Sequence, residues 1–113
     1  MVDPKVIEAV TYFKACIQEK GVRIHDLIIF GSSGSGNRTQ WSDIDIAVIS
    51  EDFKDKDIFA RTLLTKDAEL MTIRKYRVPL DIITLTPEEY NSPDSLFLRN
   101  IRKGIPLVSA QSA

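Results

Sequence analysis

The sequence has little cysteine and little histidine, and these scarcities exclude several kinds of site. Its 113 residues include one cysteine, Cys16, so no disulfide can form within the chain, and we expect a reducing, cytoplasmic location. The single histidine, His25, comes just before an apolar run. A role at the surface or at the entry to a strand suits it better than catalysis.

An excess of charge of one sign is also absent. Fifteen Lys and Arg residues face sixteen Asp and Glu residues, and the formal net charge of −1 gives no general attraction to nucleic acid. We therefore do not expect nucleic acid as a direct ligand. No apolar run approaches the length of a membrane span, and no basic-then-apolar leader opens the chain. We expect a soluble protein with no membrane partner.

The length predicts one domain over residues 1–113. We expect an N-terminal helix within residues 1–21, a core over residues 24–108 and a frayed tail over residues 109–113. Asp3 and Pro4 mark the start of the first helix, and Gly21 marks its end. One apolar stripe of this helix is formed by Val6, Val10, Phe13 and Ile17.

Strands and helices are predicted to alternate after the first helix. The expected strands are Ile24–Phe30, Ile44–Ile49, Val78–Leu85 and, at an edge, Ile105–Val108. The expected helices run from Asp55 or Asp57 to about Arg74, from a capping box at Thr86, and from about Leu96 to Gly104. We expect the middle helix to bury Phe59, Leu63, Leu70 and Ile73. The fold class is α/β (α+β), a small mixed β-sheet with helices on one face and the other face open for substrate.

Two acidic residues, Asp43 and Asp45, stand at the start of the second strand, just after a loop rich in glycine and serine. Side chains at positions i and i+2 of a strand lie on the same face, so both carboxylates project together. Mg²⁺ prefers one or two carboxylates together with phosphate oxygens of a substrate. The plain alternative is a polar hairpin edge on which both side chains are simply solvated.

Asp81 is the only charged residue of the third predicted strand. A lone carboxylate in a mostly buried strand costs free energy unless it is paired or binds a metal. If this strand lies beside the strand of Asp43 and Asp45, three carboxylates converge, as a two-metal site requires. We therefore predict that Asp43, Asp45 and Asp81 are catalytic and hold two Mg²⁺ ions.

The loop between the first two strands supplies candidates for phosphate binding. Gly31 and Ser32 offer backbone N–H groups and a hydroxyl to the phosphates of a nucleoside triphosphate. Arg38 offers a cation further along the loop. Ser42 either donates to phosphate or caps the turn before the second strand. The combined pattern predicts metal-assisted chemistry on a nucleoside triphosphate.

The order Gly-Ser, then Asp-x-Asp, then a later strand Asp resembles the polymerase-beta-type nucleotidyltransferase superfamily. Residues 30–45 are most similar to its smallest members, the minimal nucleotidyltransferases, and the resemblance covers residues 24–108. Many minimal members have an Ala-Arg-Gly run in the loop after Gly-Ser. This chain has Gly-Ser-Gly at residues 34–36 instead, and the nearby Arg38 is the residue that could replace the missing cation.

The resemblance implies a nucleotidyltransferase domain that uses Mg²⁺ to transfer AMP from ATP to a hydroxyl acceptor. Minimal members are often paired with a helical HEPN-type protein, act as the antitoxin of the pair and adenylylate a tyrosine of the toxin. The resemblance therefore implies a HEPN-type partner here, in a homo- or hetero-oligomer. Two alternatives stay open. One is transfer to a small molecule such as an aminoglycoside-like antibiotic, and the other is a non-catalytic binding module on the same fold.

Overall fold

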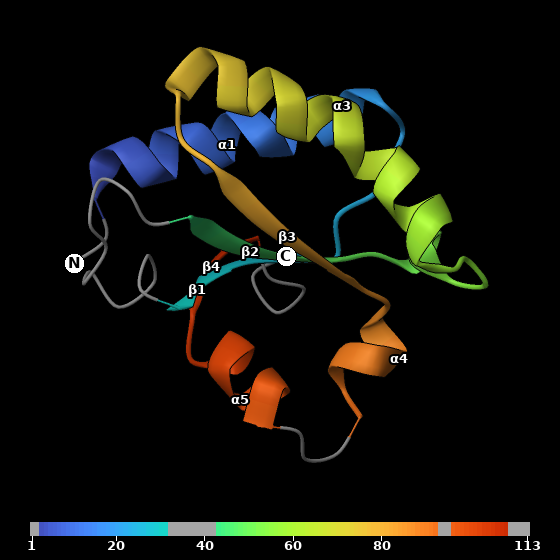
Figure 1. Ribbon diagram of the computed structural model, residues 1–113. Coiled ribbons are helices and arrows are strands. Elements are labelled where there is room, and N and C mark those ends of the chain that lie inside the picture. The colour runs from blue at the N-terminus through green and yellow to red at the C-terminus, as the bar shows by residue number, and fades with distance from the viewer. Residues whose placement is uncertain (1–2, 32–42, 93–95, 109–113) are drawn as a thin grey trace.

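The computed structural model describes residues 3–31, 43–92 and 96–108, and their strands form one four-stranded sheet in the order β3-β2-β1-β4 (Figure 1). The strands are β1 (Asp26–Phe30), β2 (Ile44–Ile49), β3 (Leu80–Leu85) and β4 (Ile105–Val108). β1 is antiparallel to β2 and to β4, whereas β2 and β3 are parallel. The predicted small mixed sheet is confirmed.

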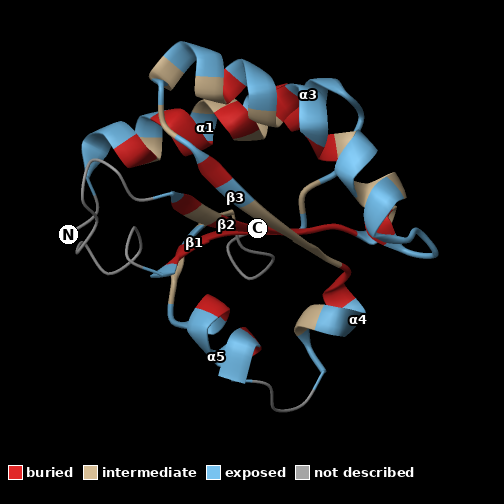
Figure 2. Cartoon of the chain, in the orientation of Figure 1, coloured by how far each residue is buried: buried red, intermediate tan, exposed pale blue. Residues whose placement is uncertain are grey.

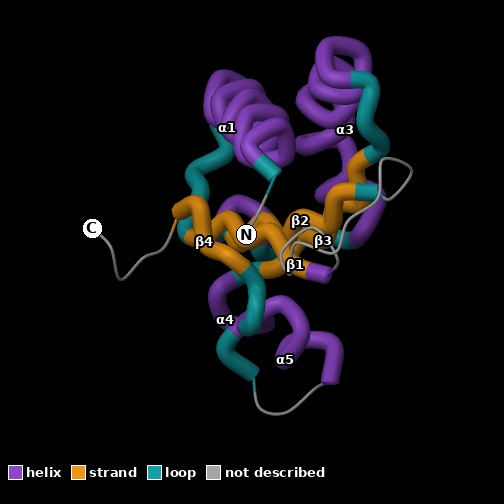
Figure 3. Tube along the Cα trace, turned by 90° about the vertical axis from the view of Figure 1, so that its left-hand side faces the viewer, coloured by secondary structure: helices purple, strands orange, loops and turns teal. Residues whose placement is uncertain are grey.

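Helices cover both faces of the sheet, so the prediction that they cover one face and leave the other open is wrong. α1 (Pro4–Glu19) and α3 (Ile58–Tyr76) lie on one face, and α4 (Pro87–Tyr90) and α5 (Leu96–Arg102) lie on the other (Figure 3). A short 3₁₀ helix, η1 (Glu51–Phe53), follows β2. The physical reason is a second apolar cluster, in which Leu98 and Ile101 of α5 bury Ile28 and Phe30 of β1.

Successive side chains of β2 belong alternately to the two apolar clusters, one on each face of the sheet. Ile44, Ile46 and Val48 belong to the larger cluster beneath α1 and α3, whereas Ala47 and Ile49 belong to the cluster beneath α5. Successive side chains of a strand point to opposite faces. Asp45 therefore projects on the same face as α5, at the end where β2 begins.

α1 follows its prediction. Asp3 caps its start by accepting a hydrogen bond from the backbone N–H of Lys5 at 2.9 Å. The predicted stripe of Val6, Val10, Phe13 and Ile17 is buried. Gly21 follows the last turn with a φ of 91°, a left-handed conformation that glycine adopts without strain.

α3 begins where the sequence predicts, but its predicted apolar stripe faces mostly toward solvent and not toward the core. Asp57 caps it, accepting from the backbone N–H of Ala60 at 2.9 Å. The predicted buried stripe is wrong for three of its four members, because Phe59, Leu63 and Leu70 are exposed and only Ile73 packs against the core. The residues of α3 that are buried are Thr65, Ala68 and Thr72. Figure 2 shows how much of α3 is exposed.

The other helix and strand boundaries lie within about two residues of the predicted ones. β1 begins at Asp26 rather than Ile24, and β3 begins at Leu80 rather than Val78. Pro79 has no backbone N–H to donate, although its carbonyl accepts from Ile44 N at 2.9 Å. The capping box of Thr86 and Glu89 is confirmed at the start of α4. Within the described ranges, no helix combines the length and the apolar character needed to cross a membrane.

Candidate active site

The parallel pairing of β2 with β3 places Asp45 directly beside Asp81. The register aligns these two residues as neighbours, with Ile44 beside Leu80 and Ile46 beside Ile82. Paired strands lie about 4.8 Å apart, and aligned residues point to the same face. The prediction that the strand of Asp81 lies beside the strand of Asp43 and Asp45 is therefore confirmed. Two of the three candidate carboxylates are cross-strand neighbours.

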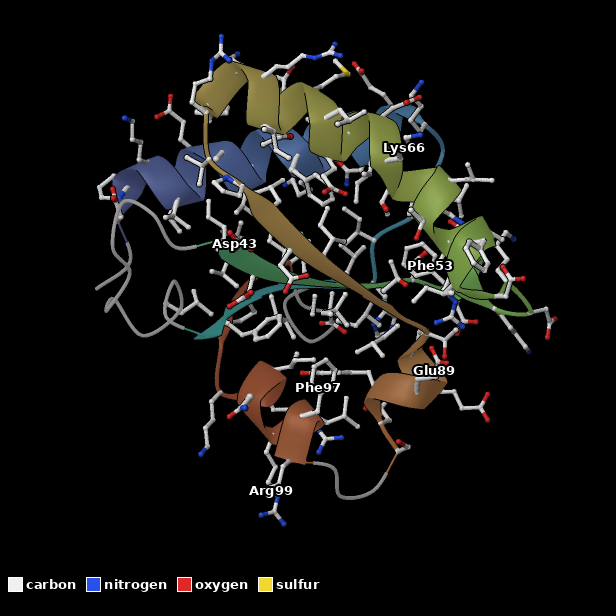
Figure 4. The ribbon with its side chains drawn as sticks, in the orientation of Figure 1. Asp43, Phe53, Lys66, Glu89, Phe97 and Arg99 are labelled. Atoms are coloured by element: carbon white, nitrogen blue, oxygen red, sulfur yellow. The ribbon has the colours of Figure 1, made fainter. Side chains whose placement is uncertain are left out.

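Asp43 adds a third negative charge at the same end of the sheet. It immediately precedes β2 and is exposed (Figure 4). Partial burial raises the pKa of Asp45, and the Asp81 and Asp43 carboxylates raise it further, with a hydrogen bond between the Asp45 and Asp81 side chains adding to the effect. Three carboxylates therefore interact at this end of the sheet.

Gly31 closes the site from the end of β1. Phe30, the residue before it, is aligned with Asp45 across the antiparallel pair. Gly31 has a φ of 65°, and a Cβ at this position would overlap the Asp45 carboxylate. The backbone can approach Asp45 this closely only because residue 31 has no side chain. The Gly-Ser loop therefore begins in direct contact with the Asp45 carboxylate.

Asp81 is more accessible than the sequence predicted. It was expected inside a mostly buried strand, but β3 is an edge strand and Asp81 is exposed. Exposure removes the desolvation argument that favoured a metal at Asp81 alone. It also leaves this carboxylate open to a substrate that approaches from solvent.

A fourth carboxylate, Glu69 of α3, was missed by the sequence reasoning. Partial burial raises the pKa of Glu69, and the negative charge of Asp81 raises it further. Glu69 lines a groove of about 150 Å³ between α3 and β3, together with Thr65 and Ile82. The apolar periodicity could not identify it, since that pattern placed α3 with the wrong face inward.

The predicted phosphate ligands Ser32, Arg38 and Ser42 lie outside the described residues, as do the glycines at positions 34 and 36. Their roles stay predictions. Of the seven candidate site residues, the structure brings together Asp43, Asp45, Asp81 and Gly31.

The carboxylates suit a hard divalent cation that also binds the phosphate oxygens of a substrate. Within residues 3–31, 43–92 and 96–108, no three His, Cys, Asp or Glu side chains are arranged closely enough to hold a metal ion by themselves. Mg²⁺ does not need such a cage, because it usually binds one or two carboxylates, water and substrate phosphates. The Asp81 and Asp43 carboxylates raise the pKa of Asp45, and a bound cation would relieve this repulsion.

Comparison with known proteins agrees with this geometry. A family model described as a nucleotidyltransferase domain matches residues 10–107. No curated protein sequence matches the chain.

Solved structures share the fold at low sequence identity. A candidate nucleotidyltransferase from Sulfolobus solfataricus is 18% identical, with a TM-score of 0.59 over 98% of this chain and 93% of that one. A toxin-antitoxin structure with AMP-PNP is 19% identical, with a TM-score of 0.61 over 88% of this chain and 73% of that one. A toxin-antitoxin MntA-HpeT mutant, in which two aspartates two positions apart are replaced by glutamate, is 17% identical, with a TM-score of 0.62 over 88% of this chain and 72% of that one. At these identities the likeness shows the fold alone.

Proposed function

The chain belongs to the nucleotidyltransferase domain family, and from this premise we propose that it transfers AMP from ATP to a hydroxyl group with the help of Mg²⁺. The observation that carries the proposal is the cross-strand alignment of Asp45 with Asp81, with Asp43 at the same end of the sheet. Carboxylates placed together on one face suit a cation that also binds phosphate oxygens. The contact between Gly31 and Asp45 supports a triphosphate lying across the same end.

In the proposed reaction, Asp43, Asp45 and Asp81 would hold two Mg²⁺ ions. When bound, Mg²⁺ would neutralise triphosphate charge and lower the pKa of the acceptor hydroxyl. Gly31 would turn its backbone toward the phosphates, and Ser32, Arg38 and Ser42 would add hydrogen bonds and a positive charge. Positioning and charge neutralisation would supply most of the rate enhancement.

Asp81 is our candidate for the proton acceptor, because its exposure leaves it open to an incoming hydroxyl. The acceptor oxygen would form a bond to the α-phosphorus while the bond from that phosphorus to the bridging oxygen breaks. Pyrophosphate would leave with the electron pair of the broken bond, and the hydroxyl proton would pass to Asp81. The acceptor would then carry AMP through a phosphodiester, whether its hydroxyl belongs to a protein or to a small molecule.

We propose a HEPN-type toxin as the acceptor, with this chain as its antitoxin. Two structures of the same fold come from toxin-antitoxin assemblies, and one of them contains AMP-PNP. The replaced aspartates of the MntA-HpeT mutant have the same spacing as Asp43 and Asp45. Transfer to a small aminoglycoside-like molecule and a binding-only antitoxin are the competing outcomes. The Gly-Ser-Gly run at residues 34–36, which stands where many minimal members have Ala-Arg-Gly, favours the binding-only case among these two.

The test is transfer of label from α-³²P-ATP in Mg²⁺, using the purified chain with a purified HEPN-type protein from the same genome. Parallel reactions with γ-³²P-ATP separate nucleotidyl transfer from phosphoryl transfer. We expect α-label, and no γ-label, on the HEPN-type protein. The label should be absent with Asp45→Asn or Asp81→Asn.

Asp67→Asn is the matched control, since it removes a carboxylate that pairs with Lys20 on the α1 side of α3. This variant should label the partner at the wild-type rate. A stable complex with the HEPN-type protein but no label on it, on the chain itself or on small hydroxyl acceptors would overturn the proposal in favour of a binding module.

A further inference from the structure

α3 carries its large apolar side chains on the outside. Phe59 is 79% exposed, Leu63 is 73% exposed and Leu70 is 41% exposed. Residues at i, i+4 and i+11 of a helix share one face, so these three form a single stripe. We call this stripe, together with Lys66 and Arg74 on the same side, the outer face of α3. From Phe59 to Arg74 it extends over about 22 Å, or about four helical turns.

The opposite face of α3 is small and partly polar, and it is the one that packs on the protein. The buried Thr72 Oγ1 donates to the backbone carbonyl of Ala68 at 2.7 Å, and the buried Thr65 Oγ1 donates to that of Thr62 at 3.3 Å. Because both hydroxyls have acceptors, burying this face leaves neither of them without a hydrogen-bond partner. The hydroxyl groups of the inward face therefore find their hydrogen-bond acceptors within α3. The outer face does not contribute its large apolar side chains to the core.

Two ion pairs lie on the flanks of α3. Arg61 donates to Glu89 at 2.8 Å on the α4 side, and Lys20 of α1 pairs with Asp67 at 3.3 Å on the other side. The stripe is exposed because the opposite face, with Thr65, Ala68 and Thr72, is the one buried against the protein.

The outer face is positively charged between its apolar residues. Lys66 lies exposed between Leu63 and Leu70, and Arg74 lies exposed one turn beyond Leu70. Of the two carboxylates of α3, Asp67 borders this face but pairs with Lys20, and the partly buried Glu69 lines the groove beside β3. The surface therefore combines apolar anchors with cations.

A second copy of the chain fits this surface poorly. In a two-fold pairing whose axis is perpendicular to α3, the two copies of α3 would be antiparallel. Lys66 lies near the midpoint of the stripe, so the axis would bring the two Lys66 side chains against each other. Like charges in a desolvated contact are unfavourable.

We propose that the outer face of α3 is a docking surface for an amphipathic helix of a partner protein, whose apolar ridge is flanked by carboxylates. The apolar anchors would pack against the ridge of the partner helix, and Lys66 and Arg74 would pair with the partner's carboxylates. α3 ends at Tyr76 and β3 begins at Leu80, so the Leu70 end of the surface lies toward the end of the sheet that carries Asp81 (Figure 1). The docking itself does not depend on nucleotidyl transfer.

The test uses two labelled synthetic peptides of about 18 residues, long enough to form a helix in isolation. Both carry the same leucine ridge, flanked by glutamate in one and by lysine in the other. Fluorescence anisotropy would measure their binding to the full chain. We expect the acidic peptide to bind about tenfold more tightly than the basic one. The double variant Lys66→Glu with Arg74→Glu should reverse that preference.

The apolar part of the surface is tested by Phe59→Ser combined with Leu63→Ser. We expect this variant to weaken the acidic peptide by about tenfold or more. Leu96→Ser on α5 is the matched control, since Leu96 is 77% exposed on the other face of the sheet, and it should leave binding unchanged. Circular dichroism melts would verify that every variant is folded, which the exposure of the replaced side chains favours.

Three results would each overturn the proposal. The first is no binding of the acidic peptide to the folded chain. The second is equal loss of binding in the α3 variant and in Leu96→Ser. The third is a wild-type dimer in sedimentation that dissociates in the α3 variant, which would assign the face to a second copy. None of these readouts involves nucleotide, so the docking surface and the proposed transferase reaction can fail independently.

Discussion

Gly31 is the residue whose identity is most tightly constrained by the candidate site. Its φ of 65° is a left-handed conformation, and a Cβ there would overlap the Asp45 carboxylate. Gly21 has a similarly positive φ of 91°, but nothing lies within 4 Å of a Cβ at that position. The two glycines therefore separate backbone strain, which both would suffer, from the contact with Asp45, which only Gly31 makes.

We predict that Gly21→Ala costs about 1 kcal/mol of unfolding free energy from backbone strain. Gly31→Ala should cost about 2–4 kcal/mol, because Asp45 must also move. Urea unfolding measured at equilibrium would give both values. In an Asp45→Ala background the excess cost of Gly31→Ala should disappear, as a double-mutant cycle would show. Equal costs for the two glycines in the wild-type background would contradict the close contact.

The local sequence predicted the position of some candidate residues in the site but not that of others. Strand periodicity predicted that Asp43 and Asp45 project together without tertiary information, and the Asp43 carboxylate does raise the pKa of Asp45. The exposure of Asp81 depends on β3 being the edge of the sheet, which no feature of its own strand reveals. Glu69 is near Asp81 only because of the orientation of α3 about its axis, so the local sequence around Glu69 could not reveal it.

Among the elements, α4 shows how a short helix can be held by its ends. Thr86 and Glu89 form a reciprocal capping box, and Glu89 also accepts from Arg61 of α3 at 2.8 Å. The hydrogen bond from Arg61 is the main cause that lowers the pKa of Glu89, followed by opposing partial burial and by the Thr86 backbone bond. α4 is thereby tied to α3 across the edge of the sheet.

This linkage gives a pH-dependent prediction. Because the pKa of Glu89 is lower in the folded protein than its ordinary value of 4.5, its stabilisation is complete above that value and is lost as the pH falls through the folded pKa. Glu89→Gln should cost about 1 kcal/mol at neutral pH, a modest value because the side chain is partly exposed. Guanidinium unfolding over a pH series should show this difference shrinking toward acid. Glu88→Gln is the neighbouring control, and a constant difference at all pH values would refute the linkage.

The contrast between α1 and α3 explains where element-level prediction succeeded. In α1, the apolar period, the cap at Asp3 and the stop at Gly21 all agree with the observed helix. In α3, the start at Asp57 was among the predicted caps, but periodicity identified a real apolar stripe and assigned it to the wrong side. Periodicity detects a stripe without saying whether the core or a partner covers it.

At the scale of the whole molecule, the sheet order brings together residues that are distant in sequence. The alignment of Asp45 with Asp81 depends on a parallel crossover through α3. The sequence predicted that the carboxylates converge only if their two strands lie side by side, and it could not establish that they do. The layering on both faces depends equally on non-local contacts, since α5 reaches back to β1 and β2. Local signals therefore predicted most elements, while their assembly into a site required the structure.

The assembled site predicts that metal and nucleotide bind as a unit. The carboxylates repel each other and also repel a free triphosphate, while the described residues lack a self-sufficient cage for a metal alone. We therefore expect Mg²⁺ together with α,β-methylene-ATP, whose bridge blocks cleavage, to stabilise the chain by about 2.7 kcal/mol at 100 times the dissociation constant. Mg²⁺ alone, or the nucleotide with EDTA, should shift thermal unfolding far less.

Asp45→Asn is the variant that makes this last prediction decisive. The pKa of Asp45 is raised above its ordinary value of 3.8 in the fold, so at neutral pH its ionised form costs stability that asparagine does not. The ligand-free variant should therefore melt at or above the wild-type temperature. It should nevertheless lose the shift caused by Mg²⁺ with α,β-methylene-ATP, because a carboxylate ligand is gone. A full shift in Asp45→Asn, or the same wild-type shift in EDTA, would place nucleotide binding elsewhere than at the paired ends of β2 and β3.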